Sequence, residues 1–151
     1  MRSQLGIVIR ALDSNDRQLL LDVADDVFDN PVHPAFAKEF LEDPRHHIVA
    51  AIDGGVVVGF VSAVHYIHPD KAPELWINEV SVATTHRRRG LGKSMMEAMF
   101  EVGRAQHCTA AWVLTDRLNP AAMALYTSAG GREGADGEDA GGDLVGYSFN
   151  L

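Results

Sequence analysis

Basic residues and glycines concentrate in one short stretch of the chain, residues 87–94. Its members are Arg87, Arg88, Arg89, Gly90, Leu91, Gly92, Lys93 and Ser94. An apolar run typical of a strand, residues 75–82, precedes it, and a run with helical spacing, residues 91–106, follows it. Glycines at a strand-to-helix turn let backbone N–H groups converge on an anion, and the helix N-terminus adds partial positive charge. The stretch therefore predicts a pyrophosphate cradle and a nucleotide-derived ligand.

Three other interpretations of this stretch fail in detail. Gly92-Lys93-Ser94 matches the end of a Walker phosphate loop, but the first glycine of that motif would fall on Arg87. The stretch also lacks the Gly-x-Gly-x-x-Gly spacing of dinucleotide-binding folds. Three arginines without interleaved aromatic residues make a poor nucleic-acid patch.

Composition limits the classes of protein to which the chain can belong. Its 151 residues are 46% hydrophobic, which predicts a single domain over residues 1–151 with a sizeable core. The net charge of −8 argues against a nucleic-acid binder and permits a cationic partner. No apolar run approaches the roughly 20 residues that span a bilayer, and the first residues lack the apolar segment of a secretory signal. Cys108 is the single cysteine, so we expect no internal disulfide and a cytoplasmic location.

The hydrophobic pattern predicts the elements that position the turn. Strands are expected over residues 6–10, 47–52, 56–66, 75–82, 110–115 and 144–151, the fifth of them buried on both faces. Helices are expected over residues 15–27, from Pro34, over 91–106, and from Pro120 to the glycines at 130–131. Asp53-Gly54-Gly55 predicts a hairpin, and residues 132–143 predict an acidic loop. If the fourth and fifth strands are neighbours they are parallel, which predicts a mixed α/β sheet.

A carboxylate stands in the middle of the fourth strand. Glu79 lies eight residues before Arg87, and carboxylates are depleted in strands. Strict alternation would place Trp76, Asn78, Val80 and Val82 on one side, and Ile77, Glu79 and Ser81 on the other. Glu79 is either a plain surface residue or a base that serves a site.

Two motifs together resemble the GNAT N-acetyltransferase superfamily. Arg87-x-x-Gly90-x-Gly92, between strand and helix, resembles its acetyl-CoA-binding signature. The second marker is Asn119-Pro120-Ala121-Ala122-Met123-Ala124-Leu125-Tyr126, followed by Gly130. The order of elements resembles that fold over essentially the whole chain. The resemblance implies an acetyl-CoA-dependent acyltransferase with a mixed, mostly antiparallel sheet, whose parallel fourth and fifth strands splay around the CoA site.

The resemblance also implies how acetyl-CoA would bind. Backbone N–H groups of Arg88 through Lys93 would donate to the pyrophosphate, and arginine side chains would pair with the phosphates. The pantetheine arm would lie along Val80 and Val82, in the gap between the splayed strands. The remaining cofactor contacts would come from Asn119, which bonds that arm, and from Ala122 and Tyr126.

Tyr126 stands where the family usually has its general acid. A phenol has a pKa near about 10, so it stays protonated and can give its proton to a departing thiolate. Asn119 and Tyr126 are seven residues apart, so they share one face of a helix. The alternative is that Tyr126 is an ordinary buried tyrosine.

In GNAT enzymes that modify aminoglycosides, a carboxylate near the position of Glu79 can receive the substrate amine. A primary amine is mostly protonated at neutral pH, so a carboxylate, directly or through water, must remove a proton before the amine attacks the thioester. The backbone N–H of Val80 would hold the thioester oxygen as negative charge develops.

The sequence is most similar to the aminoglycoside 3-N-acetyltransferase branch. The similarity lies in residues 79–82, which lead into residues 86–90, and in residues 122–127. It implies transfer to a cationic acceptor, bound by Asp26, Asp29, Glu79 and Asp116, and hence antibiotic resistance. Because Cys108 is expected to be a core residue rather than a nucleophile, we expect direct transfer in a ternary complex. The sequence departs from the branch in having Glu rather than Asp at position 79, and in the acidic residues after Gly131. Two alternatives stay open: the same chemistry on another small amine or a protein amine, and a catalytically silent CoA-binding module.

The histidines and the cysteine are not assigned to catalysis. His65 and His68 are three apart on or near a strand and point to opposite faces, so no metal is expected; His65, Tyr66 and His68 could instead border the acceptor pocket. Cys108 is expected to be a small core residue. We expect no nucleic-acid or membrane partner, and a homodimer stays open because many members of the superfamily are dimers.

Overall fold

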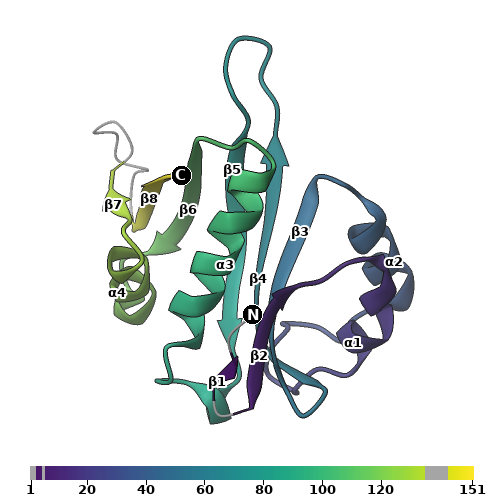
Figure 1. The fold of residues 1–151 in the computed structure, drawn as a ribbon. Helices are drawn as coiled ribbons and strands as arrows, with labels where there is room; N and C mark the ends of the chain where they lie inside the picture. The colour runs from purple at the N-terminus through teal and green to yellow at the C-terminus, as the bar shows by residue number, and fades with distance from the viewer. Residues whose placement is uncertain (1–2, 5, 135–142) are drawn as a thin grey trace.

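The computed structural model describes residues 3–4, 6–134 and 143–151, which form one open sheet of eight strands (Figure 1). In spatial order the strands are β1 (Ser3–Gln4), β2 (Ile7–Ala11), β3 (His46–Asp53), β4 (Val56–Tyr66), β5 (Glu74–Val82), β6 (Ala110–Asp116), β8 (Leu144–Asn150) and β7 (Arg132–Glu133). Neighbouring strands are antiparallel, except that β5 and β6 are parallel. The mixed, mostly antiparallel α/β sheet expected from the sequence is confirmed.

Helices cover both faces of this sheet. They are α1 (Arg17–Leu21), α2 (Pro34–Glu42), α3 (Leu91–Ala105) and α4 (Pro120–Ser128), with 3-10 turns η1 (Ser14–Asp16) and η2 (Thr84–His86). A Cβ on Gly59 of β4 would lie 3.1 Å from Met95 of α3. The next strand residues on the opposite face, Phe60 and Ser62, border a cavity beside α2. Helix α3 therefore packs on one face, and α1 and α2 pack on the other, where they contact β3 and β4 (Figure 1).

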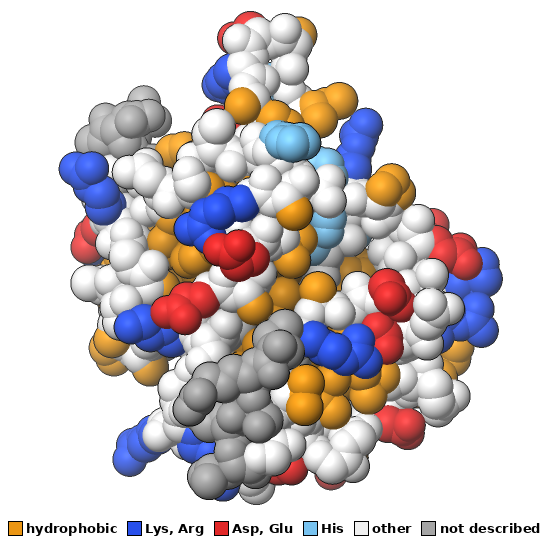
Figure 2. All heavy atoms as spheres, in the orientation of Figure 1, with side chains coloured by type: hydrophobic (Ala, Val, Ile, Leu, Met, Phe, Trp, Pro, Cys, Tyr) orange, Lys and Arg blue, Asp and Glu red, His pale blue; other side chains and the backbone are white. Residues whose placement is uncertain are grey.

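The core lies chiefly between α3 and the sheet. Leu91, Met95 and Met99 recur at helical spacing along α3 and are each at most 1% exposed. Burying side chains of this size stabilises the fold by roughly 1.5–3 kcal/mol each. Outside this layer, charged side chains of both signs are interspersed over the face that α3 covers (Figure 2).

The first helix is much shorter than the sequence predicts. A helix was expected over residues 15–27, but α1 ends at Leu21. The N–H of Val57 donates to the Asp22 carbonyl at 3.1 Å, and the N–H of Ala24 donates to the Val57 carbonyl at 2.9 Å. The chain after α1 therefore exchanges its hydrogen bonds with the start of β4 instead of continuing the helix. Asp13 caps the 3-10 turn η1 before α1, because its carboxylate accepts from the N–H of Asn15 at 2.8 Å.

Two further expectations need correction. Strand β6 is buried on one face only, since Leu114 is 42% exposed. Helices α1 and α2 cover this second face of the sheet only over β3 and β4. They do not cover it over β6. Arg132 and Glu133, expected in a loop, form β7 by pairing with β8. The rest of that acidic loop, residues 135–142, lies outside the described residues.

Local signals in the sequence were reliable at two turns. Strand β3 ends at Asp53 and β4 begins at Val56, so the Asp-Gly-Gly hairpin is confirmed. Asn119 caps α4, with its Oδ1 accepting from the N–H of Ala122 at 3.1 Å, and proline occupies the first turn as expected.

Candidate active site

The turn between β5 and α3 adopts left-handed backbone at two positions. Arg88 has a φ of 63° and Gly90 a φ of 74°. This conformation is free for glycine and uncommon for a residue with a side chain. Gly90 is also the N-cap of α3, so the chain bends immediately before the helix starts. Strained backbone of this kind clusters at ligand sites, and such turns gather N–H groups into concavities that bind anions.

The first turn of α3 adds donors at the same place. Leu91, Gly92 and Lys93 begin the helix, so their N–H groups have no carbonyl one turn earlier. The N–H of Ser94 donates to the Gly90 carbonyl at 3.1 Å, while its hydroxyl has no hydrogen-bond partner among the described residues and is available to a ligand. The first turn of α3 has no acidic residue. These backbone donors, with the exposed side chains of Arg88 and Arg89 beside them, fit a pyrophosphate.

Helix α4 packs closely against the start of α3. A Cβ on Gly92 would lie 3.1 Å from Cδ2 of Leu125. The second glycine of the motif therefore serves a close approach between helices. This contact places the α4 residues Asn119, Ala122 and Tyr126 on the helix next to the turn.

Strands β5 and β6 separate part-way along their length. Their pairing runs from Glu74 opposite Ala110 to Ile77 opposite Val113 and extends no further. Strand β5 nevertheless continues to Val82. The splay expected from the sequence is therefore present, and it leaves the facing backbone edges open to an extended ligand.

A β-bulge marks the point of separation. Across β4 and β5, the register changes from Ala63 opposite Ile77 to Ser62 opposite Glu79. Asn78 thus has no partner on β4. Bulges are common beside active sites, where they redirect side chains.

The bulge overturns the alternation expected along β5. Paired residues on neighbouring strands lie on the same face. The register therefore places on the α3 face Ile77, Val80 and Val82, and on the other face Trp76, Glu79 and Ser81. The expectation fails for Trp76 and Ile77, because the bulge shifts the alternation by one residue at Asn78. Glu79 remains opposite Val80 and Val82.

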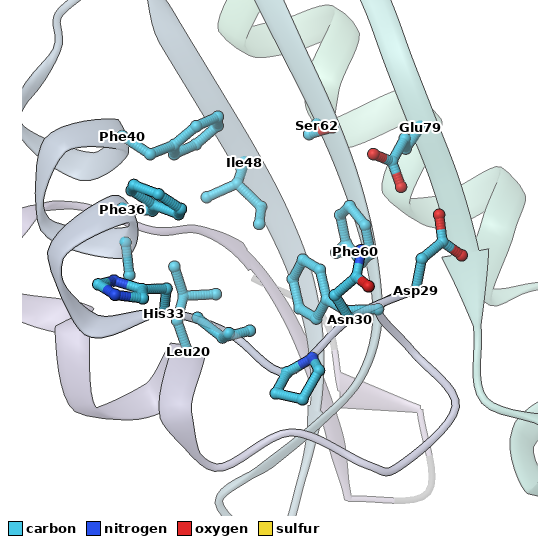
Figure 3. A pocket seen from close by; sticks show the side chains of 14 residues that line it. Leu20, Asp29, Asn30, His33, Phe36, Phe40, Ile48, Phe60, Ser62 and Glu79 are labelled. Carbon is cyan, nitrogen blue, oxygen red and sulfur yellow. The ribbon is translucent and has the colours of Figure 1, made fainter.

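A cavity of about 320 Å³ lies beside Glu79 (Figure 3). Its aromatic lining comes from Phe28, His33, Phe36, Phe40 and Phe60, and its polar lining from Asp29, Asn30, Ser62 and Glu79. The Phe28 and Phe60 rings stack with centroids 4.2 Å apart. Figure 3 shows the two carboxylates at one end and the rings of α2 at the other. The cavity combines an anionic end with an aromatic wall, which suits an amine joined to an apolar or ring-shaped group.

The structure brings only some of the predicted acceptor residues together. Asp29 and Glu79 line the same cavity. Asp26 instead accepts from the N–H of Thr84 at 2.8 Å and from its hydroxyl. Asp116, at the end of β6, accepts from the N–H of Leu118 at 2.8 Å and so stabilises the turn into α4. Neither Asp26 nor Asp116 is among the residues that line this cavity.

Tyr126 is buried on α4. Its side chain is 5% exposed, and its ring centroid lies 5.6 Å from that of Tyr147. Burial raises the pKa of the Tyr126 hydroxyl, because the charged phenolate is poorly solvated there. The phenol therefore keeps its proton throughout the neutral range.

Sequence reasoning missed the aromatic wall of the cavity. Phe36 and Phe40 were expected on a short helix after Pro34, but nothing connected that helix to Glu79. Their i, i+4 spacing placed them on one face of α2, which could have signalled a shared surface. The cavity becomes visible only when α2 packs beside β3 and β4.

Apart from His33, which lines the cavity, the histidines named as candidates in the sequence lie outside its lining. His47 Nε2 and His65 Nδ1 are 2.8 Å apart, and Tyr66 donates to Glu74 at 2.9 Å. Figure 2 shows histidines gathered near the upper ends of β3 and β4. None of His65, Tyr66 and His68, which were expected to border an acceptor pocket, lines this cavity. Among the residues that the structure describes, no three His, Cys, Asp or Glu side chains are grouped so that they could hold a metal ion.

Comparison with known proteins decides the family. Residues 17–130 match the model of the Acetyltransferase (GNAT) family. The chain belongs to this family. As a GNAT member it is an acetyl-CoA-dependent N-acetyltransferase, which makes a catalytically silent module the weaker alternative.

Individual relatives differ in what they acetylate. The N-alpha-acetyltransferase RimI of Mycobacterium tuberculosis (strain ATCC 25618 / H37Rv) is 29% identical over 126 residues, or 82% of this chain and 77% of the relative. The L-2,4-diaminobutyric acid acetyltransferase of Nocardia farcinica (strain IFM 10152) is 29% identical over 61% of this chain and 46% of the relative. An aminoglycoside acetyltransferase from an uncultured soil metagenomic sample superposes with a TM-score of 0.70 and 25% identity, over 85% of this chain and 93% of that one. The GNAT fold is thus shared among relatives with different acceptors.

No helix in the described part of the chain has both the length and the hydrophobicity that crossing a membrane requires.

Proposed function

We propose that this GNAT enzyme acetylates a primary amine that enters the cavity beside β5. The observation that carries the proposal is the meeting of Asp29 and Glu79 at one end of a single cavity (Figure 3). Glu79 lies directly after the bulge at which β5 leaves β6, so it stands next to the gap in which the acyl donor would lie.

Glu79 would act as the base. An alkylammonium ion must lose a proton before its nitrogen can attack, and the Glu79 carboxylate would accept that proton directly or through water. Ser62 lies opposite Glu79 on β4 and lines the same cavity, so its hydroxyl can hold such a water. Asp29 would hold the amine, or a second ammonium group, by charge.

The other groups would act on the acyl carbon and the leaving group. Acetyl-CoA supplies an acetyl thioester, whose thiolate is an adequate leaving group. The N–H of Val80 would donate to the thioester oxygen as negative charge develops. Tyr126 would donate its proton to the departing sulfur, and its burial keeps that proton in place at neutral pH.

The turn at residues 87–94 would hold the CoA phosphates. The support is the left-handed backbone at Arg88 and Gly90 together with the free donors of the first turn of α3. Arg87 would have a smaller share, because its Nε already donates to the Val82 carbonyl at 3.1 Å. Asn119 uses its Oδ1 as a cap, so only its amide nitrogen is left to donate to the pantetheine arm.

We propose an aminoglycoside as the acceptor, modified at its 3-amino group, which would make the enzyme a resistance determinant. The paired carboxylates and the net charge of −8 support a polycationic ligand. Solved structures with this fold include an aminoglycoside acetyltransferase in complex with sisomicin, at a TM-score of 0.72 and 17% identity.

A peptide or protein N-terminus is the second candidate. The aromatic wall of Phe28, Phe36 and Phe60 favours it, because such a wall suits a hydrophobic first side chain better than a fully polar sugar. The similarity of the chain to RimI, an N-alpha-acetyltransferase, also supports a peptide or protein N-terminus as the acceptor.

An acceptor panel separates the two candidates. Acetyl-CoA thiol release is measured with gentamicin-like and kanamycin-like aminoglycosides, simple polyamines, and peptides with hydrophobic or polar first residues. An aminoglycoside acceptor predicts turnover that weakens as salt rises, because screening acts over about 8–10 Å. Turnover on peptides alone would contradict the aminoglycoside proposal. Loss of turnover in Glu79→Gln on the best acceptor checks that the same cavity is responsible.

A further inference from the structure

The short turn that precedes residues 87–94 is held by two carboxylates from distant parts of the chain. Asp26 accepts from the N–H of Thr84 at 2.8 Å and from the Thr84 hydroxyl. His86 Nε2 lies 2.8 Å from Oδ2 of Asp53, in the β3–β4 hairpin. Thr84 and His86 are the first and last residues of η2. The backbone that leads into the CoA turn is therefore held from two sides.

This turn precedes backbone that needs outside support. Arg87 is extended, with φ −69° and ψ 160°, and the next residue, Arg88, is left-handed. A left-handed residue with a side chain persists only when its surroundings determine its conformation. The contacts to η2 lie two to four residues away and are the nearest anchors that come from other parts of the chain.

The segment that carries Asp26 also forms one wall of the acceptor cavity. Ser81 of β5 donates from its hydroxyl to the Val27 carbonyl at 2.7 Å. Phe28 and Asp29 line the cavity itself. Within four residues, the segment thus contacts the turn before the CoA site, the strand that carries Glu79, and the acceptor cavity.

We propose that Asp26 is a positioning residue for the CoA-phosphate turn, acting through Thr84, and does not contact the acceptor. This inference rests on the proposed placement of CoA at residues 87–94. Asp26 does not line the cavity, and one of its oxygens already accepts two hydrogen bonds from Thr84. Those bonds also hold the pKa of the Asp26 carboxyl below its usual range, so the carboxylate is charged at neutral pH.

The direction of the effect separates positioning from simple electrostatics. Asp26→Ala removes a negative charge near an anion site, and by charge alone CoA would then bind more tightly. A positioning role predicts the opposite, because η2 loses its anchor. Asp25→Ala is the matched control: Asp25 is exposed, carries the same charge one residue earlier, and makes no hydrogen bond or ion pair among the described residues.

The test is calorimetric binding of CoA to the full chain. We expect Asp26→Ala to bind CoA roughly three- to tenfold more weakly, and Asp25→Ala to match wild type or bind slightly more tightly. Thr84→Val removes the hydroxyl bond but keeps the bond from the backbone N–H, so it should weaken CoA binding in the same direction as Asp26→Ala but by less, and Thr84→Ser should restore it. The double variant Asp26→Ala/Thr84→Val should bind CoA no worse than Asp26→Ala alone, because losing the Asp26 carboxylate already removes both bonds.

Other results would overturn the inference. Equal CoA affinity in Asp26→Ala and Asp25→Ala would remove the positioning role, as would a raised acceptor KM in Asp26→Ala with an unchanged CoA affinity. If Asp26→Ala does not fold, the CoA affinities of Thr84→Val and Thr84→Ser decide instead. Equal affinity in these two variants would overturn the inference. Wild-type protein that does not bind CoA would refute the proposed CoA site instead, and loss of binding in Gly90→Val would support that site whatever the result at Asp26.

Discussion

A single residue without a partner on β4, Asn78, brings Glu79 into the cavity that Asp29 also lines. Ile77 is 1% exposed and faces α3. Because side chains alternate with a period of two, a regular strand would place Glu79 on the same face as Ile77. A carboxylate there would lie against the apolar core, where an unpaired charge costs several kcal/mol. The bulge avoids that cost and turns Glu79 toward Asp29.

Glu79→Gln tests the proposed base. The amide keeps the size of the side chain but cannot take up the proton, so kcat should fall by about 10²- to 10⁴-fold. The KM for acetyl-CoA should stay close to wild type, because Glu79 lies on the cavity face of β5. Glu97→Gln, at an exposed position on α3, is the control and should leave turnover unchanged. Full turnover in Glu79→Gln would remove Glu79 from the mechanism.

Tyr126→Phe tests the proposed acid. The change removes only the hydroxyl, so the ring packing against Tyr147 is retained and the melting temperature should change little. Thiol release should slow by roughly 10²-fold, because the thiolate must leave without a proton donor. Steady-state thiol release and thermal unfolding measure the two effects. A large loss of stability with normal turnover would identify Tyr126 as a core residue only.

At the scale of elements, the contact between α3 and α4 connects the two motifs of the family. Gly92 belongs to the first motif and Leu125 to the second, and they approach so closely that a side chain at position 92 meets the leucine. Gly92 therefore lets the two helices pack closely, and its N–H is also one of the donors in the first turn of α3. Moving α4 would move Asn119 and Tyr126 with it.

Gly92→Val measures this packing. Two methyl groups forced against Leu125 should lower the free energy of unfolding by about 1–3 kcal/mol. Leu125→Ala makes room for them, so the double variant should cost less than the sum of the two single changes. Urea denaturation of the four proteins gives the coupling. Strict additivity would show that the two residues do not constrain each other.

Sequence reasoning succeeded for elements whose signals are local. The hairpin at Asp53 and the capped start of α4 depend on the chemistry of a few adjacent residues. It failed for residues 15–27, where the periodicity is helical but the chain after Leu21 bonds to β4. Such competition comes from a distant strand and leaves no trace in the local pattern.

At the scale of the whole molecule, acid should weaken the fold through His47. The pKa of His47 is lowered from 6.5 to about 4, chiefly by burial and also by the nearby charges of His65 and His46. Below pH 6.5 the unfolded chain takes up a proton that the folded chain resists. The contribution is therefore fully present above about pH 6.5 and is lost as pH falls toward 4.

Chemical denaturation at pH 7 and pH 5 measures this loss. The drop in unfolding free energy that depends on His47 should be about 1 kcal/mol, because the side chain is only partly buried and solvent reduces the effect. His47→Gln should lose correspondingly less stability between the two pH values. His107→Asn, at an exposed position, should behave as wild type does. Identical pH dependence in His47→Gln and wild type would contradict the assignment.

The sequence by itself determined the chemistry of the turn, the order of the elements and the family resemblance. These depend on neighbouring residues: glycines that permit left-handed backbone, caps that start helices, and apolar runs of fixed period. Only the tertiary structure decided which carboxylates share a site. In the structure, Asp29 and Glu79 line one cavity, Asp26 accepts hydrogen bonds from Thr84, and Asp116 stabilises the turn into α4. The physical reason is that strand register and the bulge at Asn78 come from long-range pairing, and one residue of register changes the face to which a side chain belongs.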